Sequence, residues 1–227
     1  QVSVRLALSA SVVREIQRQL ISFPAHPPKL YQVWLHRAFL AVAVTFLFCN
    51  RGASSVQCRS SDIFWSAEGV WLHISAPKGK QHLPTHKKPV LHIPSSVHPW
   101  LAPCLDRFCA YARRSPPACS TPADYFWALP DDNPAEWTAS TMTVWLRMAT
   151  TAVLSRCAAG GTWSSHSLRK GAASEMNAVG VPLDRIRYWG GWAKHSNVVS
   201  DYIDPSVLPS SSSRFFFGWL SPFSRSV

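Results

Sequence analysis

The stretch that decides the fold lies between residues 163 and 205 and holds three motifs. They read HSLRKGAAS (166–174), GVPLDRIRYWGGW (180–192) and DYIDP (201–205). On a helix, side chains three residues apart share a face, so His166 and Arg169 are expected to point into one pocket. The motifs place a histidine, an arginine, a tryptophan and a tyrosine within about 40 positions of one another.

The residue types in the motifs suit cleavage of a phosphodiester bond without a metal ion. Such a reaction needs a nucleophile, cations for the non-bridging oxygens, a base for the nucleophile's proton and an acid for the leaving oxygen. Tyr202 suits reversible cutting, because a phosphotyrosyl bond keeps the energy needed for rejoining. Arg169 suits the clamp, because a guanidinium is always charged and contacts phosphate through two nitrogens. Taken singly, each is an ordinary core or surface residue, and only their spacing indicates a site.

In this order and spacing the motifs resemble the C-terminal signature of the tyrosine recombinases, the phage-integrase family. In that signature, His-x-x-Arg is followed by Gly-His or Gly-Trp and then by a tyrosine one helical segment later. Here Arg169 and Trp192 are 23 positions apart, as in the family. The wider string is similar to recombinases of DIRS- and crypton-type mobile elements. The resemblance covers residues 11–205 and implies an α+β, mainly α fold, that of the DNA breaking-rejoining enzyme catalytic domain.

The resemblance also implies functional residues upstream. The family has an arginine after an apolar helix and an aspartate 11 residues later, just before the first strand, which matches Arg51 and Asp62. Arg51 is expected to be a buried clamp rather than a charge that favours the helix dipole. The family's catalytic lysine follows the second strand, which matches Lys78 in preference to Lys80.

Each matched residue carries a role from the family. Tyr202 attacks phosphorus to give a 3′-phosphotyrosyl link and a free 5′-hydroxyl. The resemblance implies neither a metal nor a nucleotide cofactor. The other expected roles are phosphate clamping by Arg51 and Arg169, proton transfer from the nucleophile by His166, protonation of the 5′ oxygen by Lys78, and a hydrogen bond to phosphate from the Trp192 indole.

Two positions depart from the family pattern. The third residue after Arg51 is usually acidic and here is Ser54, and Trp192 lies 10 positions before Tyr202, where 9 is common. A misplacement of about 1 Å can cost on the order of a hundredfold in rate. Because of these departures, a second interpretation stays open, in which the chain is a degenerate domain that binds DNA without cutting it. A type IB topoisomerase shares the tyrosine chemistry, but the short chain and the YIDP context disfavour it.

The composition is that of a globular protein with a sizeable core. Of 227 residues, 47% are hydrophobic and 15% charged, with a formal net charge of +11. Residues 1–114 carry 14 Lys and Arg against 4 Asp and Glu, whereas residues 115–227 carry 9 against 8. The excess fits a surface that meets a polyanion, with a solubility bias as the alternative. The predicted DNA contacts are Lys80, Lys87, Lys88 and Lys170.

Cysteine and histidine spacing indicates neither disulfides nor a metal site. The six cysteines have no paired metal-ligand spacing, so buried free thiols are expected. The series His82, His86, His92 and His98 has no nearby Cys or carboxylate ligand and is not interpreted as a zinc site. The apolar run at 38–49 is 12 residues long, too short to span a bilayer, and predicts a buried helix.

Hydrophobic periodicity predicts helices at 11–23, 30–49, 54–59, 100–113, 138–158, 167–179 and 182–189, and strands at 63–65, 70–75 and 90–93. The three strands are expected to form a small antiparallel sheet.

We divide the chain into an N-terminal helix and linker (1–28), a catalytic domain (29–207) and an aromatic tail (208–227). This division leaves no room for the helical core-binding domain of the family.

The expected partners and location follow from the resemblance. They are double-stranded DNA, other copies of the chain in a tetramer on that DNA, and no membrane. The tail is expected to dock on a neighbouring subunit, in preference to its own domain. The expected location is the nucleus for a eukaryotic mobile element, and otherwise the cytoplasm or nucleoid.

Overall fold

The computed structural model describes residues 6–24, 29–73, 90–112, 125–129, 132–154, 163–193 and 196–222. Within these residues the helices are α1 (Ala10–Ser22), α2 (Leu30–Leu47), α3 (Gly52–Val56), α4 (Leu101–Tyr111), α5 (Ala139–Val153), α6 (Ser165–Ala178), α7 (Leu183–Trp189), α8 (Val198–Tyr202) and α9 (Ser211–Phe217). The strands are β1 (Ile63–Ser66), β2 (Gly69–His73) and β3 (Val90–Pro94). The expected mainly helical fold with one small sheet is confirmed.

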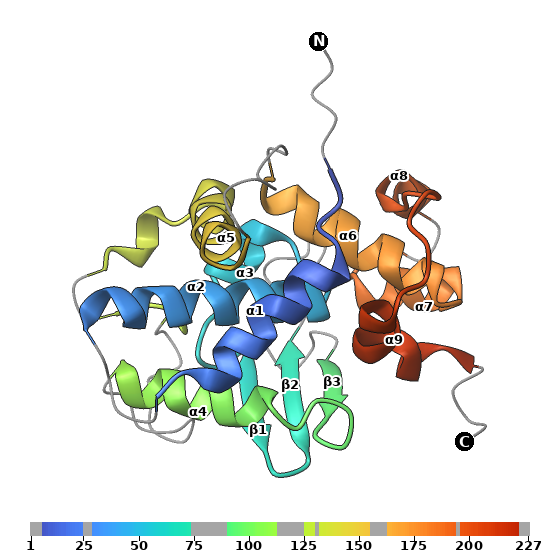
Figure 1. The fold of residues 1–227 in the computed structure, drawn as a ribbon. Coiled ribbons are helices and arrows are strands. Elements are labelled where there is room, and N and C mark those ends of the chain that lie inside the picture. The colour runs from blue at the N-terminus through green and yellow to red at the C-terminus, as the bar shows by residue number, and fades with distance from the viewer. Residues whose placement is uncertain are drawn as a thin grey trace.

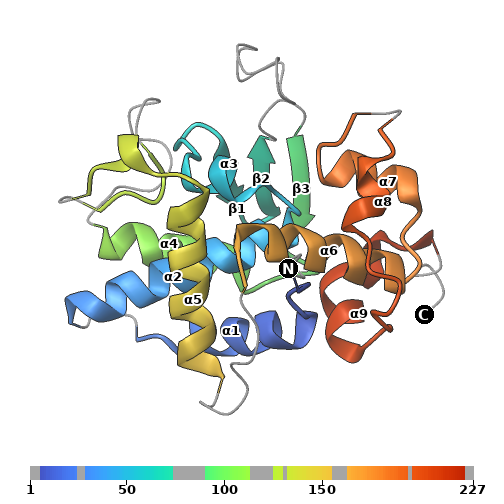
Figure 2. The same ribbon diagram turned by 90° about the horizontal axis from the view of Figure 1, so that it is seen from above.

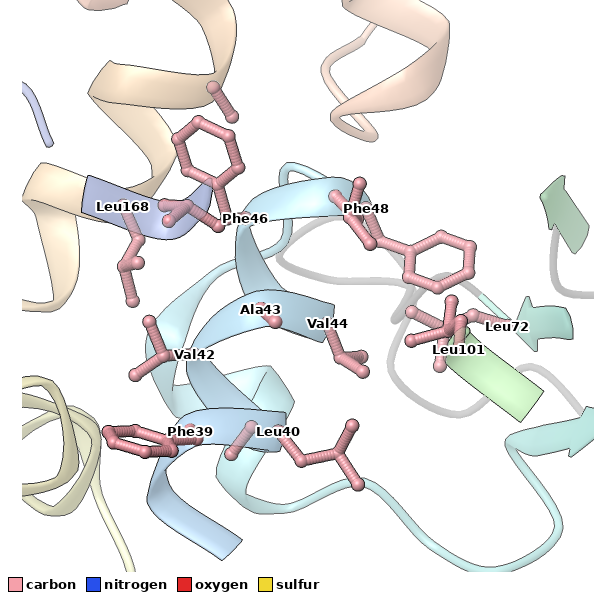
Figure 3. Close-up of a cluster of buried hydrophobic side chains, with 14 of the residues drawn as sticks. Phe39, Leu40, Val42, Ala43, Val44, Phe46, Phe48, Leu72, Leu101 and Leu168 are labelled. Atoms are coloured by element: carbon pink, nitrogen blue, oxygen red, sulfur yellow. The ribbon is translucent and has the colours of Figure 1, made fainter. Parts of the chain in front are cut away.

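The helix α2 forms the centre of the core. Every residue from His36 to Leu47 is buried, because α1, α4, α5 and α6 all pack around this helix. Figure 3 shows its apolar side chains pointing in several directions, toward Leu72, Leu101 and Leu168 on three other elements. Among the described residues α2 alone has the length and hydropathy of a membrane span, and 72% of it is buried inside the protein. It is therefore the predicted core helix.

The sheet is antiparallel in the order β1-β2-β3. Ile63, Leu72 and Leu91 lie side by side across the strands and face the core, each at most 3% exposed. On the opposite face the Trp71 ring stacks on Phe64 of β1, at 5.2 Å between ring centroids, and on His92 of β3, at 4.4 Å. Their β-branched and aromatic residues are what marked these short segments as strands.

The helices that follow the sheet are arranged around α2. In Figure 1, α2 crosses the middle of the molecule, with α5 and α6 above it and α4 and the sheet below. Figure 2 shows α7, α8 and α9 gathered at one end of α6. The helix α5 begins where expected, because the Thr138 hydroxyl accepts a hydrogen bond from the Ser140 amide at 3.2 Å.

The aromatic segment after residue 210 packs on its own chain. Phe216, Phe217 and Leu220 are at most 1% exposed, and the Phe217 ring lies 5.4 Å from that of Phe46 on α2. The expectation that this segment docks on a neighbouring subunit is therefore wrong for the residues that the structure describes. Its apolar side chains complete the core of their own chain instead, because α9 covers α1, α2 and α6.

Candidate active site

The C-terminal end of α2 supplies the first element of the site. Cys49 adopts φ +50°, the left-handed conformation that usually needs glycine at this position after a helix. It is held there because the Cys49 and Asn50 amides donate to the carbonyls of Phe46 and Thr45, each at 3.0 Å. This turn directs the Cys49 carbonyl toward α6, where it accepts a hydrogen bond from Arg169 Nη1 at 3.1 Å. Burial raises the pKa of the Cys49 thiol to about 11, so the thiol stays neutral.

Arg169 is a buried cation with unused hydrogen-bonding capacity. The residue is 3% exposed, and its Nε and Nη2 have no hydrogen-bond partner among the described residues. Its guanidinium carbon lies 3.7 Å from the centroid of the Trp192 ring, which supports the charge from one side. Burial, and to a lesser extent the charge of Arg51, lower the pKa of this guanidinium. An arginine nevertheless keeps its charge at neutral pH.

Tyr202 is brought to the same place by α8. Its hydroxyl oxygen lies 3.4 Å from Nδ1 of His166, which is an exposed residue in the first turn of α6. The Tyr202 ring packs edge-on against Trp192, with ring centroids 5.4 Å apart. One aromatic side chain, Trp192, therefore positions both the buried cation and the phenol.

These side chains line one pocket between α3, α5, α6 and α8. Its lining residues are Arg51, Gly52, Ala53, Ala139, Ser165, His166, Arg169 and Tyr202. Gly52 is required by the approach of α3 to α6, since a Cβ there would lie 2.4 Å from Cβ of Ser165. Two guanidinium groups, an imidazole and a phenol hydroxyl thus share a small volume, which suits an anionic phosphate ester.

The predicted site residues fall into three groups in the structure. His166, Arg169, Trp192 and Tyr202 lie together as the motif spacing implies. Arg51 lines the same pocket but is exposed, so the expectation of a buried clamp is wrong. It sits at the N-terminal cap of α3, where the chain has left the apolar end of α2. The lysines 78, 80, 87 and 88 lie outside the described residues.

Lys170, whose predicted contact with DNA stays a prediction, pairs with an acid of its own chain. Its ammonium lies 3.3 Å from Oδ2 of Asp204, two residues beyond Tyr202. Sequence reasoning missed Asp204, and it also missed Ser174 and the Cys49 carbonyl. A backbone carbonyl gives no signal in the sequence, but Ser174 lies four and eight positions after Lys170 and His166, which indicates a shared helix face.

The histidines of the sequence series that the structure describes have separate places. His92 lies in the aromatic row of the sheet, while the buried His98 has Nε2 3.2 Å from the Phe216 carbonyl oxygen. Within the described residues no group of three or more His, Cys, Asp or Glu side chains is placed to hold a metal ion. The described cysteines 49, 58, 104 and 109 are buried free thiols, as predicted.

Comparison with known proteins gives a likeness to solved structures, among them a lambda integrase. No protein-family model and no curated protein matches the chain. A crystal structure of a lambda integrase dimer bound to a COC′ core site superposes with a TM-score of 0.48 and 17% sequence identity. The match covers 89% of this chain and 60% of that one, so this chain spans less than two thirds of the other's length. At this identity and TM-score the likeness concerns the fold and says nothing of activity.

Proposed function

We propose that this chain is the catalytic domain of a tyrosine recombinase, which cleaves a DNA strand and rejoins it through a 3′-phosphotyrosyl intermediate. The observation that carries the proposal is the buried Arg169, whose Nε and Nη2 are unpaired and which lines the same pocket as Tyr202. Buried guanidinium nitrogens are nearly always paired in proteins, so two unpaired ones that line a pocket favour an anionic ligand there.

The chemistry assigns one step to each side chain. The Tyr202 oxygen attacks phosphorus, and the bond from phosphorus to the 5′ oxygen breaks. The phenol proton passes to Nδ1 of His166, which lies 3.4 Å from the hydroxyl and closes to normal hydrogen-bond distance on DNA. Arg169 and Arg51 hold the non-bridging oxygens as negative charge builds on them. Lys78 is the proposed donor of the proton that the departing 5′ oxygen takes up.

The rest of the proposal follows from the family that the motifs resemble. The substrate is double-stranded DNA, the source is a mobile element of the DIRS or crypton kind, and the active assembly is a tetramer on DNA. For a eukaryotic element this activity takes place in the nucleus. The predicted contacts of Lys80, Lys87 and Lys88 with the DNA backbone belong to the same proposal.

The test is covalent capture on a nicked suicide duplex, from which the short strand diffuses away after cleavage. We expect a covalent protein–DNA adduct with the wild-type protein and none with Tyr202→Phe. Tyr188→Phe is the matched control, because Tyr188 is an exposed tyrosine of α7 outside the pocket, and it should form adduct at the wild-type rate. Adduct formation by Tyr202→Phe would overturn the assignment.

A second candidate function is DNA binding without cleavage, and the exposure of Arg51 favours it. An exposed guanidinium holds phosphate less firmly than a buried one, because water competes for it. Salt-dependent binding of the duplex with no adduct at any protein concentration would support this function. Relaxation of supercoiled plasmid without a target site would indicate a topoisomerase instead.

A further inference from the structure

The backbone on either side of Tyr202 is attached to α6 through one buried hydroxyl. Ser174 is 0% exposed, and its Oγ donates to the carbonyl of Tyr202 at 3.2 Å and to that of Lys170 at 2.8 Å. The same Oγ accepts a hydrogen bond from the Asp204 amide at 2.8 Å. A hydroxyl has one hydrogen and two lone pairs, so the two carbonyls share the hydrogen and the amide uses a lone pair.

A second attachment follows immediately along the chain. The Asp204 carboxylate uses Oδ2 for the Lys170 ammonium, at 3.3 Å, and Oδ1 for the amide and hydroxyl of Ser206, at 3.1 and 2.6 Å. The hydrogen bonds from Ser206, together with the nearby Lys170 charge, lower the pKa of this carboxyl, which is therefore ionised at neutral pH. The turn after the nucleophile is thus closed on itself and tied to α6.

The three residues of α6 that meet the nucleophile segment form one stripe. His166, Lys170 and Ser174 follow one another at four-residue intervals and so lie on one face of the helix. They contact in turn the hydroxyl of Tyr202, the carboxylate of Asp204 and the backbone between them. The five residues of α8 are too few for a helix that is stable by itself, so its position depends on such contacts.

We propose that Ser174 and the Lys170–Asp204 pair are positioning residues that hold Tyr202 in the active site of its own chain. The proposal rests on the function proposed for Tyr202, and it replaces the predicted contact of Lys170 with DNA. The stripe fixes the tyrosine from its C-terminal side. The attachment keeps the hydroxyl 3.4 Å from Nδ1 of His166, although Trp192 and Tyr202 are 10 positions apart.

Ser174→Ala is the first test, with two readouts on the full chain. Hydrogen exchange needs no DNA, and the Asp204 amide should exchange about three- to tenfold faster, as expected for the loss of one hydrogen bond. Amides of α2, followed in the same sample, report any global loss of stability. At saturating DNA the rate of adduct formation should fall by about tenfold or more, because the hydroxyl of Tyr202 is misplaced. Ser200→Ala, at an exposed serine of α8, is the control.

Lys170→Met and Asp204→Asn separate the ion pair from a contact with DNA. Each should slow adduct formation at saturating DNA, and the double variant should be no slower than the slower single variant, because both remove one interaction. DNA affinity should keep its dependence on salt. A weaker affinity with a salt slope smaller by about one, and an unchanged rate at saturation, would show that Lys170 contacts a phosphate.

The two readouts separate the positioning proposal from the proposed function. If the wild type forms no adduct, the proposed function fails, and faster exchange at Asp204 in Ser174→Ala still supports the attachment. If the wild type forms adduct and Ser174→Ala matches it in rate and exchange, the positioning proposal fails while the recombinase remains. Equal acceleration of exchange at Asp204 and in α2 also overturns it, since that indicates global unfolding.

Discussion

Arg169 is buried in a way that costs stability. The free-energy cost of removing a charged group from water is offset only by hydrogen bonds and neighbouring charges. Two nitrogens of this guanidinium have no hydrogen-bond partner among the described residues. One carbonyl and the face of Trp192 are its main support. Under the proposed function, the phosphate of the DNA supplies the missing partners.

Arg169→Met tests this account with a side chain of similar length and no charge. We expect the free energy of unfolding to stay within about 1 kcal/mol of wild type or to rise, because an incompletely paired cation is replaced by an apolar side chain. Urea denaturation measures the change. Inorganic phosphate should raise the melting temperature of the wild type and not that of the variant. Arg185→Met, at an exposed arginine of α7, should respond to phosphate as the wild type does. A loss of more than about 3 kcal/mol in Arg169→Met would show that the arginine is structural.

His36 gives the stability of the protein a dependence on pH. The residue is 0% exposed on α2, and neither ring nitrogen has a hydrogen-bond partner among the described residues. Burial, and secondarily the Arg107 charge, lower the pKa of His36 from 6.5 to about 3. Between these values the unfolded chain binds a proton that the folded protein does not. Stability is therefore complete above pH 6.5 and decreases as the pH falls toward 3.

For this histidine alone, we expect the free energy of unfolding to fall by about 2 kcal/mol between pH 7 and pH 5. His36→Phe removes the titration and keeps an aromatic ring between Phe23 and Tyr111. The free energy of unfolding, measured by urea denaturation at pH 7, 6 and 5, should fall less steeply in the variant. Parallel curves for the two proteins would contradict the assignment. Burial is the main cause that lowers the pKa of His98 to about 4. Its contribution to the pH dependence of stability is the same in the wild type and in the variant.

At the scale of single residues, the sequence predicts side chains whose role depends on spacing, and misses those whose role depends on the backbone. His166, Arg169, Trp192 and Tyr202 are placed correctly by their distances along two helices and a connection. The exposure of Arg51 was not predictable, because it depends on the left-handed turn at the preceding Cys49. The residue types do not indicate that a cysteine adopts a positive φ here, because this position after a helix is ordinarily occupied by glycine.

The helix α6 is the element on which the site is built. One face meets the nucleophile segment, another places Arg169 beneath the pocket, and a third contacts the chain before α1, where the Leu8 amide donates to the Ser167 carbonyl at 3.0 Å. Small residues permit this packing, since Gly171, Ala172 and Ala173 are all buried. The approach is closest at Gly171, where a Cβ would lie 2.1 Å from the Leu8 carbonyl oxygen.

Gly171→Ala is therefore expected to destabilise the protein although alanine favours helices. The helix propensity alone would give a gain of about 1 kcal/mol. The clash with the Leu8 backbone outweighs it, and we expect a net loss of about 2 kcal/mol, as for other overpacked sites. Thermal unfolding measures the change. Ala178→Gly, at the end of α6, is the control for propensity and should cost less than about 1 kcal/mol. A stabilised Gly171→Ala would mean that the segment before α1 moves freely.

Most elements were predictable because they are long or flanked by capping residues. The helices α1, α2, α4 and α5 are long enough for a pattern of apolar residues to mark them, and the strands are rich in β-branched and aromatic residues. The observed ends of these elements differ from the predicted ends by a few residues, because fraying and capping determine where a helix ends. The helices α8 and α9 were not predicted, because they are too short to show a period and neither begins at a proline, the signal that marks the equally short α7. Their positions come from tertiary contacts with α6.

At the scale of the whole molecule, the two ends of the described chain meet at Glu175 of α6. Its Oε1 accepts a hydrogen bond from the Ala10 amide at 2.7 Å, at the start of α1. Its Oε2 accepts one from the Ser213 hydroxyl at 2.6 Å, in the first turn of α9. The carboxylate is 4% exposed. One side chain therefore joins the first and last helices to the helix that carries the site.

Glu175→Ala leaves the buried Ala10 amide without its acceptor and removes the carboxylate to which the Ser213 hydroxyl donates. We expect it to lower the free energy of unfolding by about 2 to 3 kcal/mol. Glu175→Gln should cost less, because the amide oxygen still accepts one hydrogen bond. A double-mutant cycle with Ser213→Ala, read by urea denaturation, should give a coupling of about 1 kcal/mol or more. Strict additivity would show that the two side chains act independently.

The convergence on Glu175 also has a mechanical consequence. A force that pulls the two ends of the described chain apart passes from Ala10 through the Glu175 carboxylate to Ser213, bypassing the residues between them. The Leu8–Ser167 hydrogen bond and the buried side chains of α9 carry part of the same load, so both ends of the described chain pull on α6. Tension applied through the flanking segments is therefore expected to reach α6, the helix whose stripe holds Tyr202.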